Sequence, residues 1–263
     1  MSTQNMTLEQ RIYNAASSQQ VEKLHGIHNY LHARAFQAEE FSTIWSRSDE
    51  TSWAHSFGRM RGFDEIWYDS VTIYDALAYE SYLELYDIFP DIGGLDPRAI
   101  MELSMHTIVN GVVEVAEDGQ SARASFITPG ILYDRLNRDM KKRCMNFWER
   151  YGADFVCEDG TWVYLHEHVC PDFGMPLDVG NAAAQGYQML ANPPKGPRPP
   201  RPAGRKEMIM LADPQPLHQM YSLTTPVQNT VPCPVPYKTM DDNNTYTPFL
   251  NPPASASDEE DAE

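Results

Sequence analysis

The fold is decided by the stretch from Ser104 to Trp162, which reads SMHTIVNGVVEVAEDGQSARASFITPGILYDRLNRDMKKRCMNFWERYGADFVCEDGTW. Apolar and polar residues alternate through most of it, which is typical of β-strands buried on one face. The turn sequence EDG occurs at 117–119 and again at 158–160. These turns predict antiparallel strands over 104–115, 121–128, 145–157 and 162–169, with an inserted helix or charged excursion over 131–142.

The region upstream of this stretch has a helical pattern. Val21, Leu24 and Ile27 recur at helical spacing, and Phe41 continues the pattern after a break near 37–38. A short strand is expected over 52–57, followed by a helix, in one or two parts, that begins at Glu65 behind an Asp64 cap. Helices followed by an antiparallel meander predict an α+β fold, with the N-terminal helices against one curved sheet.

Proline is dense downstream of this region, from 193 to 253. Because proline fixes φ and lacks an amide donor, residues 176–253 are expected to form an extended Pro-rich arm. Met208–Leu211, Tyr237 and Phe249 make this arm too apolar for a free linker, so it should pack on the body or on a neighbouring subunit. We therefore predict a domain over 1–175, the arm over 176–253 and an acidic disordered tail over 254–263.

Composition excludes several classes of function. The net charge of −17 disfavours nucleic acid or an anionic membrane as a partner. The four cysteines form no CxxC pair, so structural zinc is not expected, and a chain this long with an ample core is not expected to need a disulfide framework. No apolar run approaches the ~20 residues of a membrane span and no signal peptide is evident, which predicts a cytoplasmic protein. Without GxGxxG, P-loop or GxSxG motifs, no nucleotide, acyl-enzyme or other cofactor chemistry is expected.

His106 is the first candidate for catalysis. Histidine has the side-chain pKa nearest neutrality, and this one lies in a strand predicted to be buried. Strand alternation would place Ile108, Asn110 and Val112 on the same face, with Asn110 as a hydrogen-bond donor. A structural histidine satisfied by a neighbour is the alternative.

The later strands supply further candidates. Tyr151 could hydrogen-bond a carbonyl or enolate oxygen, or be a core tyrosine. Glu149, on the same face, could supply a carboxylate, although a solvated edge position is its ordinary interpretation. His166 and His168 share a face by alternation and could chelate a metal together with His106. No metal is expected, because no carboxylate pattern accompanies them.

The remaining pocket candidates are aromatic or imidazole side chains from three segments: Trp53 and His55 on the first short strand, Phe126 on the second long strand, and His32 on the first helix. His25, His28 and His32 follow one another at three- and four-residue steps, so they share a helix face. A partly exposed polar stripe is the ordinary interpretation of that face.

An ordered set of short motifs resembles the SnoaL-like branch of the nuclear-transport-factor-2-like superfamily over residues 7–175. The set is Phe41 and Trp45, RGFDEI at 61–66, SMH at 104–106, ARA at 122–124 and EDGTW at 158–162. The resemblance implies a cone-shaped, curved antiparallel sheet wrapped by helices around an apolar pocket. It also implies a homo-oligomer, a dimer or trimer, in which the arm could exchange between subunits.

The resemblance extends to individual residues. It implies that His106 takes the place of the catalytic strand histidine of the dehydratases, and Tyr151 that of a polar pocket residue. Gln37 stands where their helix-break carboxylate is expected, and 127–130 lacks their second acid. The resulting hypothesis is a cofactor-independent proton-transfer enzyme, a dehydratase, isomerase or cyclase acting on an apolar ring-containing small molecule. A non-catalytic ligand-binding or assembly module is the alternative, because the fold alone does not determine the function.

Overall fold

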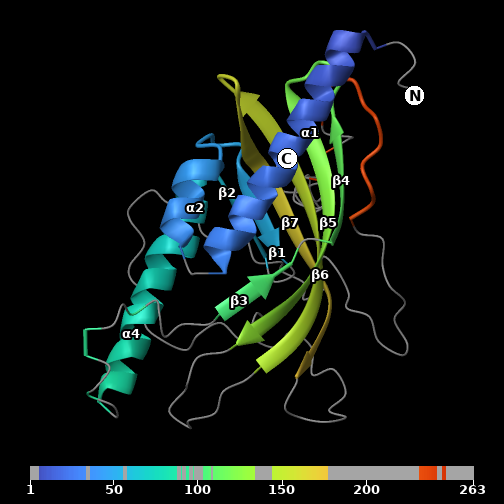
Figure 1. Cartoon of the computed structure of the whole chain (residues 1–263). Coiled ribbons are helices and arrows are strands. Elements are labelled where there is room, and N and C mark those ends of the chain that lie inside the picture. Colours follow the sequence, from blue (N-terminus) through green and yellow to red (C-terminus); the bar gives the residue numbers. More distant parts are fainter. Residues whose placement is uncertain are drawn as a thin grey trace, which may run out of the picture.

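Helices precede a curved sheet in the computed structural model of this chain (Figure 1), which describes residues 6–33, 36–55, 58–87, 90, 93–94, 97, 103–107, 109–133, 144–176, 231–241 and 245–246. The elements are α1 (Leu8–His32), α2 (Gln37–Ile44), β1 (Ser52–His55), β2 (Gly58–Arg61), α3 (Phe63–Trp67), η2 (Tyr68–Ile73), α4 (Tyr74–Tyr86), β3 (Leu103–His106), β4 (Val109–Val115), β5 (Ser121–Tyr133), β6 (Cys144–Glu158) and β7 (Thr161–Pro176). The α+β order confirms the predicted class and agrees with the fold that the SnoaL-like resemblance implies.

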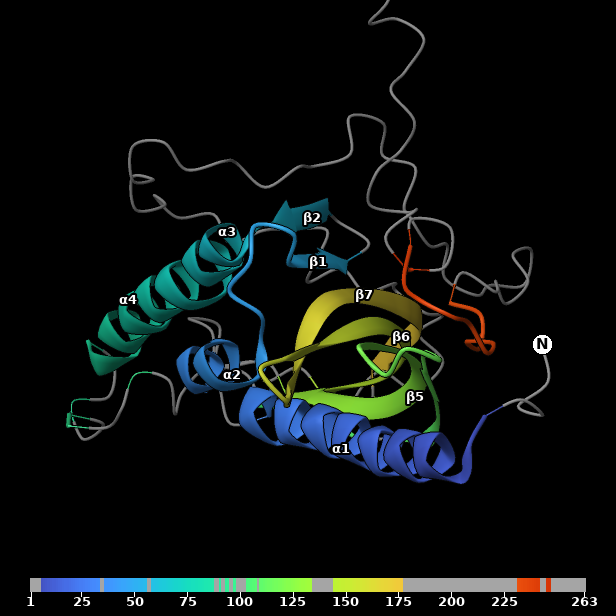
Figure 2. The same ribbon diagram turned by 90° about the horizontal axis from the view of Figure 1, so that it is seen from above.

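The sheet is mixed rather than purely antiparallel. Its strands follow the order β2-β1-β7-β6-β5-β3, and β4 also pairs with β5. β1 runs parallel to β7, whereas the other pairs are antiparallel. The β1–β2 hairpin comes before the meander in sequence and adds to its outer strand, so the direction of β1 is not set by a hairpin connection. Figure 2 shows the strong curvature of β5, β6 and β7 beside α1.

α1 covers the concave face of this sheet. Thr7 caps its N-terminus in a capping box with Gln10. The buried side of α1 carries Ser17, Val21, His25, His28 and Asn29, which face β3, β4 and β7. This face is unusually polar for a helix that packs on a sheet, and it positions two imidazoles inside the domain.

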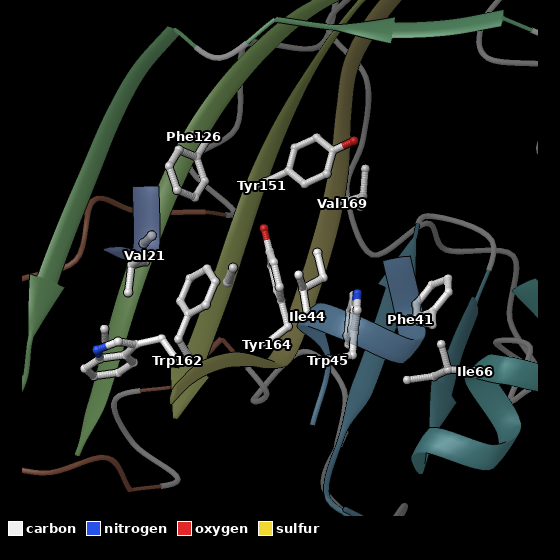
Figure 3. Close-up of a cluster of buried hydrophobic side chains, with 14 of the residues drawn as sticks. Val21, Phe41, Ile44, Trp45, Ile66, Phe126, Tyr151, Trp162, Tyr164 and Val169 are labelled. Atoms are coloured by element: carbon white, nitrogen blue, oxygen red, sulfur yellow. The ribbon is translucent and has the colours of Figure 1, made fainter. Parts of the chain in front are cut away.

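An apolar core occupies the rest of the concave side. Phe126, Phe155 and Tyr164 project from the central strands, and Phe41 and Trp45 come from α2 and the residue after it. Figure 3 shows Tyr151 and Tyr164 pointing from neighbouring strands into the same interior. The backbone N–H of Ser46 donates to the carbonyl of Tyr164, so the end of α2 is fastened to β7.

The predicted strand over 104–115 is two strands in the structure. β3 pairs with the C-terminal part of β5, and β4 pairs with its N-terminal part. The register of the β4–β5 pair shifts between Val109 and Val112. Val112 pairs with Ser125, on the face opposite to His106, so the single face predicted for 106–112 is wrong. β5 continues to Tyr133, beyond the expected end at 128, while 134–143 lie outside the described residues.

The helix expected at Glu65 begins two residues earlier. Gly62 is its N-terminal flanking residue, and its φ of 89° lies in the region that favours glycine. Asp64 therefore lies within the first turn rather than capping it. Through η2 the helix continues as a π-helical turn before α4.

The described part of the arm packs on the convex face of the sheet of its own chain. Val231, Tyr237 and Tyr246 are buried there. The backbone N–H of Tyr246 donates to Asp154 Oδ2 at 2.9 Å, and the Arg123 guanidinium lies 4.5 Å from the Tyr246 ring centre. Residues 177–230, 242–244 and 247–263 lie outside the described part, and the expected exchange between subunits stays a prediction.

Among the described residues, no helix combines the length and apolar character that a membrane crossing requires.

Candidate active site

Ionisable side chains gather on the concave face beneath α1, next to the apolar core. We call them the buried polar cluster; its members are His25, His28 and His32 from α1, Glu40 from α2, His55 from β1, His106 from β3, Glu149 and Tyr151 from β6, and Tyr164 and Glu167 from β7. Six elements therefore contribute to one site.

His106, Tyr151 and Glu149 form one side of the cluster. The Tyr151 hydroxyl donates to Glu149 Oε2 at 3.1 Å and lies 3.3 Å from His106 Nδ1. His106 Nδ1 is itself 3.5 Å from Glu149 Oε2, and only 3% of the His106 side chain is exposed. Because the tyrosine proton is directed to Glu149, its oxygen can accept from Nδ1–H, and in that tautomer the lone pair lies on Nε2.

Burial lowers the pKa of His106 to about 3, although the nearby Glu149 works in the opposite direction. The ring is therefore neutral at physiological pH. Glu149 is buried because β6 is a central strand between β5 and β7, so the solvated edge position was wrong.

His28 and Glu40 form a second pair. His28 Nδ1 lies 2.7 Å from Glu40 Oε1, which also accepts from Trp45 Nε1 at 3.4 Å. Burial alone would lower the pKa of His28, but the carboxylates of Glu167 and Glu40 raise it to about 9. Burial would likewise raise the pKa of Glu40, but His28 lowers it to about 2. At neutral pH this is an imidazolium–carboxylate ion pair.

Glu167 reaches the cluster because of an irregularity in β7. Its register shifts between Asp154–His166 and Phe155–Tyr164, which leaves Leu165 unpaired. The bulge interrupts the alternation, so Tyr164 and Glu167 share the concave face. Trp53 Nε1 donates to Glu167 Oε2 at 3.0 Å, and burial raises the pKa of Glu167.

The same bulge places His166 and His168 on the convex face, which corrects their predicted position in the pocket. His166 Nδ1 lies 3.1 Å from Asp154 Oδ2, and His168 pairs with Gly152, against which Tyr246 packs. Neither histidine can join His106 in a metal site. Among the described residues, no group of histidine, cysteine and acidic side chains has the arrangement of a metal site.

His32 and His55 lie at the two margins of the cluster. His32 Nδ1 is 3.8 Å from Glu40 Oε2, and 35% of its side chain is exposed. His55 Nε2 is 3.9 Å from Glu149 Oε1, and its ring stacks on Trp53. Both predicted candidates therefore contact the site, as does Trp53 through its indole N–H.

The polar stripe on α1, expected to be partly exposed, is buried at His25 and His28, and only His32 is partly exposed. His25 is fully buried and stacks on Phe126 with ring centres 3.8 Å apart, while its Nδ1 lies 2.6 Å from the Tyr164 hydroxyl. Burial lowers the pKa of His25 well below its usual value, so this ring is neutral. The side chain of Asn110 and all of Ile108 lie outside the described residues.

Sequence reasoning missed Glu40, although a signal was present. Gln37, Glu40, Phe41 and Ile44 are spaced as one helical face, and all four are buried. A carboxylate does stand directly before the helix-break aromatic, and it is Glu40 instead of a residue at the position of Gln37. Glu167 had no comparable signal, because the bulge that turns it inward is invisible in the alternation.

Several buried atoms of the cluster lack a hydrogen-bond partner among the described residues. They are His28 Nε2, Glu40 Oε2, Glu167 Oε1 and His25 Nε2. Buried polar atoms are normally paired with protein or water, so these atoms mark a place suited to a polar ligand group or water. Where the sequence predicts an apolar pocket, the structure places mainly buried ionisable side chains.

Comparisons with known proteins relate this chain to solved structures only. No family model matches it, and no curated protein matches it. A putative scytalone dehydratase from Novosphingobium aromaticivorans is similar at 11% identity and a TM-score of 0.46, over 75% of this chain and 99% of that one. A hexachlorocyclohexane dehydrochlorinase, LinA-type3 from Novosphingobium barchaimii, is similar at 14% identity and a TM-score of 0.41, over 65% and 95%.

A nuclear-transport-factor-2-like superfamily protein from Salmonella enterica is similar at 18% identity and a TM-score of 0.40, over 65% of this chain and 99% of that one. Sequence identities and TM-scores this low do not carry the activities of those proteins over to this chain.

Proposed function

We propose that this chain is an enzyme that transfers protons without a cofactor, on a small ring-containing molecule bound at the buried polar cluster. Dehydration, isomerisation and cyclisation are the reaction classes that such chemistry serves. The observation that carries the proposal is the arrangement of His106, Tyr151 and Glu149, in which a buried neutral imidazole is held by a hydroxyl and a carboxyl group.

His106 would act as the general base. Its Nε2 lone pair takes a proton from a carbon next to a carbonyl, and the imidazolium that forms lies 3.5 Å from Glu149. Although its pKa is about 3 in the free protein, an enolate forming beside the ring adds a negative charge that raises this pKa during the reaction. Tyr151 fixes the ring orientation through its contact with Nδ1.

The surroundings of His106 favour a cyclic substrate. Phe147 meets its ring edge to face with centres 4.9 Å apart, and the His55 ring stacks on Trp53 on the other side of Glu149. Aromatic side chains offer flat surfaces for a ring, while the unpartnered polar atoms select a ring that carries oxygen.

Deuterium exchange tests the base directly. β-Hydroxycyclohexanone has acidic C–H bonds beside its carbonyl, and their exchange in deuterium oxide is followed by proton NMR. The wild type should accelerate exchange, and His106→Gln should lose about 10²–10⁴-fold of that acceleration. His166→Gln is the matched control, because it also removes a buried histidine held by a carboxylate, on the convex face.

Equal exchange by the wild type and a folded His106→Gln protein would rule out the base. Binding of the ketone without any exchange would favour the non-catalytic ligand-binding alternative.

A further inference from the structure

We propose that His28, Glu40 and Glu167 form a second centre that binds a hydroxyl group of the substrate and protonates it as it leaves. This inference rests on the proposed function and narrows the reaction to the elimination of water. The substrate class is then a cyclic β-hydroxy carbonyl compound.

The geometry gives His28 a proton to donate. Its Nδ1 is engaged by Glu40 Oε1 at 2.7 Å, and its Nε2 lies 3.7 Å from Glu167 Oε1. A carboxyl oxygen at each end of the ring favours protons on both nitrogens, which agrees with the pKa of about 9. Nε2–H is then a buried donor without a hydrogen-bond partner among the described residues.

A hydroxyl group fits the unpartnered atoms better than other oxygen groups. One oxygen at about 2.8 Å from each atom can bridge His28 Nε2 and Glu167 Oε1, which are 3.7 Å apart. The hydroxyl accepts from Nε2–H and donates to the carboxyl oxygen. A carboxylate or phosphate would instead bring negative charge against Glu40 and Glu167, so acidic substrates are disfavoured.

The acid centre lies next to the base. The Tyr151 ring is 6.1 Å from both the His28 ring and the His106 ring. The His32 ring is also close to both, at 5.5 Å from His28 and 5.2 Å from His106. A small ring beside Tyr151 therefore has a proton acceptor and a proton donor within its reach.

The elimination balances without another reactant. His106 takes the proton from the carbon next to the carbonyl, and the electron pair of that C–H bond becomes the C=C bond. The C–O bond breaks, and the departing oxygen takes the Nε2 proton of His28 and leaves as water. His106 gains the proton that His28 loses, and the partly exposed His32 between them offers a path for exchange with solvent.

The two centres are separated by measuring two reactions of β-hydroxycyclohexanone. Exchange of the C–H bond for deuterium requires the base alone, whereas formation of cyclohexenone requires the acid as well. His28→Gln should slow elimination at least about 10²-fold more than it slows exchange. His106→Gln should lose both reactions, and His166→Gln should keep both.

Unchanged elimination in His28→Gln, or exchange without elimination in the wild type, would overturn the acid centre and leave the proposed base standing. Absence of exchange in the wild type would overturn both.

His28→Gln leaves the Glu40 carboxylate buried without its cation, so a second variant is needed. His28→Gln/Glu40→Gln replaces the pair by two amides and should show the same selective loss of elimination.

Nitrogen NMR of the His28 ring in the wild-type chain is an independent measurement. Both ring nitrogens should be protonated at neutral pH; a neutral ring would overturn the proposal. The groups that face this ring are Glu40 from α2, Glu167 and Tyr164 from β7, Glu149 and Tyr151 from β6, His106 from β3, and His25 and His32 from α1.

Discussion

Glu40→Gln should destabilise the domain strongly, because the glutamine keeps the shape of Glu40 but removes the charge that pairs with His28. The pKa of Glu40 falls from 4.5 to about 2 in the folded chain. At about 1.4 kcal/mol for each pH unit, this difference corresponds to about 3 kcal/mol of stabilisation at neutral pH. The loss of one partner from a buried ion pair costs a similar amount, about 3–5 kcal/mol.

The effect should depend on pH in a defined direction. The folded-state pKa of Glu40 is lowered. Its contribution to the free energy of unfolding is therefore present above pH 4.5 and is lost as the pH falls through about 2. The folded-state pKa of His28 is raised. Its contribution to the free energy of unfolding is therefore full below pH 6.5 and is lost as the pH rises through about 9. The difference between wild type and variant should therefore be largest between 4.5 and 6.5 and shrink towards alkaline pH.

Guanidinium unfolding followed by tryptophan fluorescence measures the free energy of unfolding at each pH. Glu39→Gln is the matched control, because Glu39 is the exposed neighbour of Glu40 on α2, and it should change stability by less than about 0.5 kcal/mol. A Glu40→Gln cost below about 1 kcal/mol, or one that is the same at pH 6.5 and above 9, would refute the ion pair.

Two further predictions concern the base and the arm. The rate of deuterium exchange should stay level as the pH falls through 6.5, because burial lowers the pKa of His106 to about 3; a decline centred at 6.5 in folded protein would contradict this. Gly152→Ala should lower the free energy of unfolding by about 1–3 kcal/mol, because its Cβ would lie 2.8 Å from the Tyr246 ring. Gly26→Ala in α1, where a Cβ meets nothing within 4 Å, should cause no loss, and equal results for the two glycines would refute the packing of Tyr246 on the sheet.

The local pattern of apolar and polar residues was sufficient to predict the α+β order of helices and strands. The helical spacing around Val21 and the two EDG turns depend only on neighbouring residues, so the helices and the antiparallel meander could be predicted. The same patterning placed His106 and Tyr151 on buried strands, and the structure brings their side chains to 3.3 Å.

Tertiary structure alone decided which polar residues face inward. Whether Glu149 is buried depends on the strands that flank β6, and the inward direction of Glu167 depends on the unpaired Leu165 in β7. His28 and Glu40 become an ion pair only when α1 and α2 pack on the same sheet. The alternation of apolar and polar residues predicts which side chains of one strand share a face. The burial and the pKa of a side chain depend instead on the elements packed against that face, and these elements are distant in sequence.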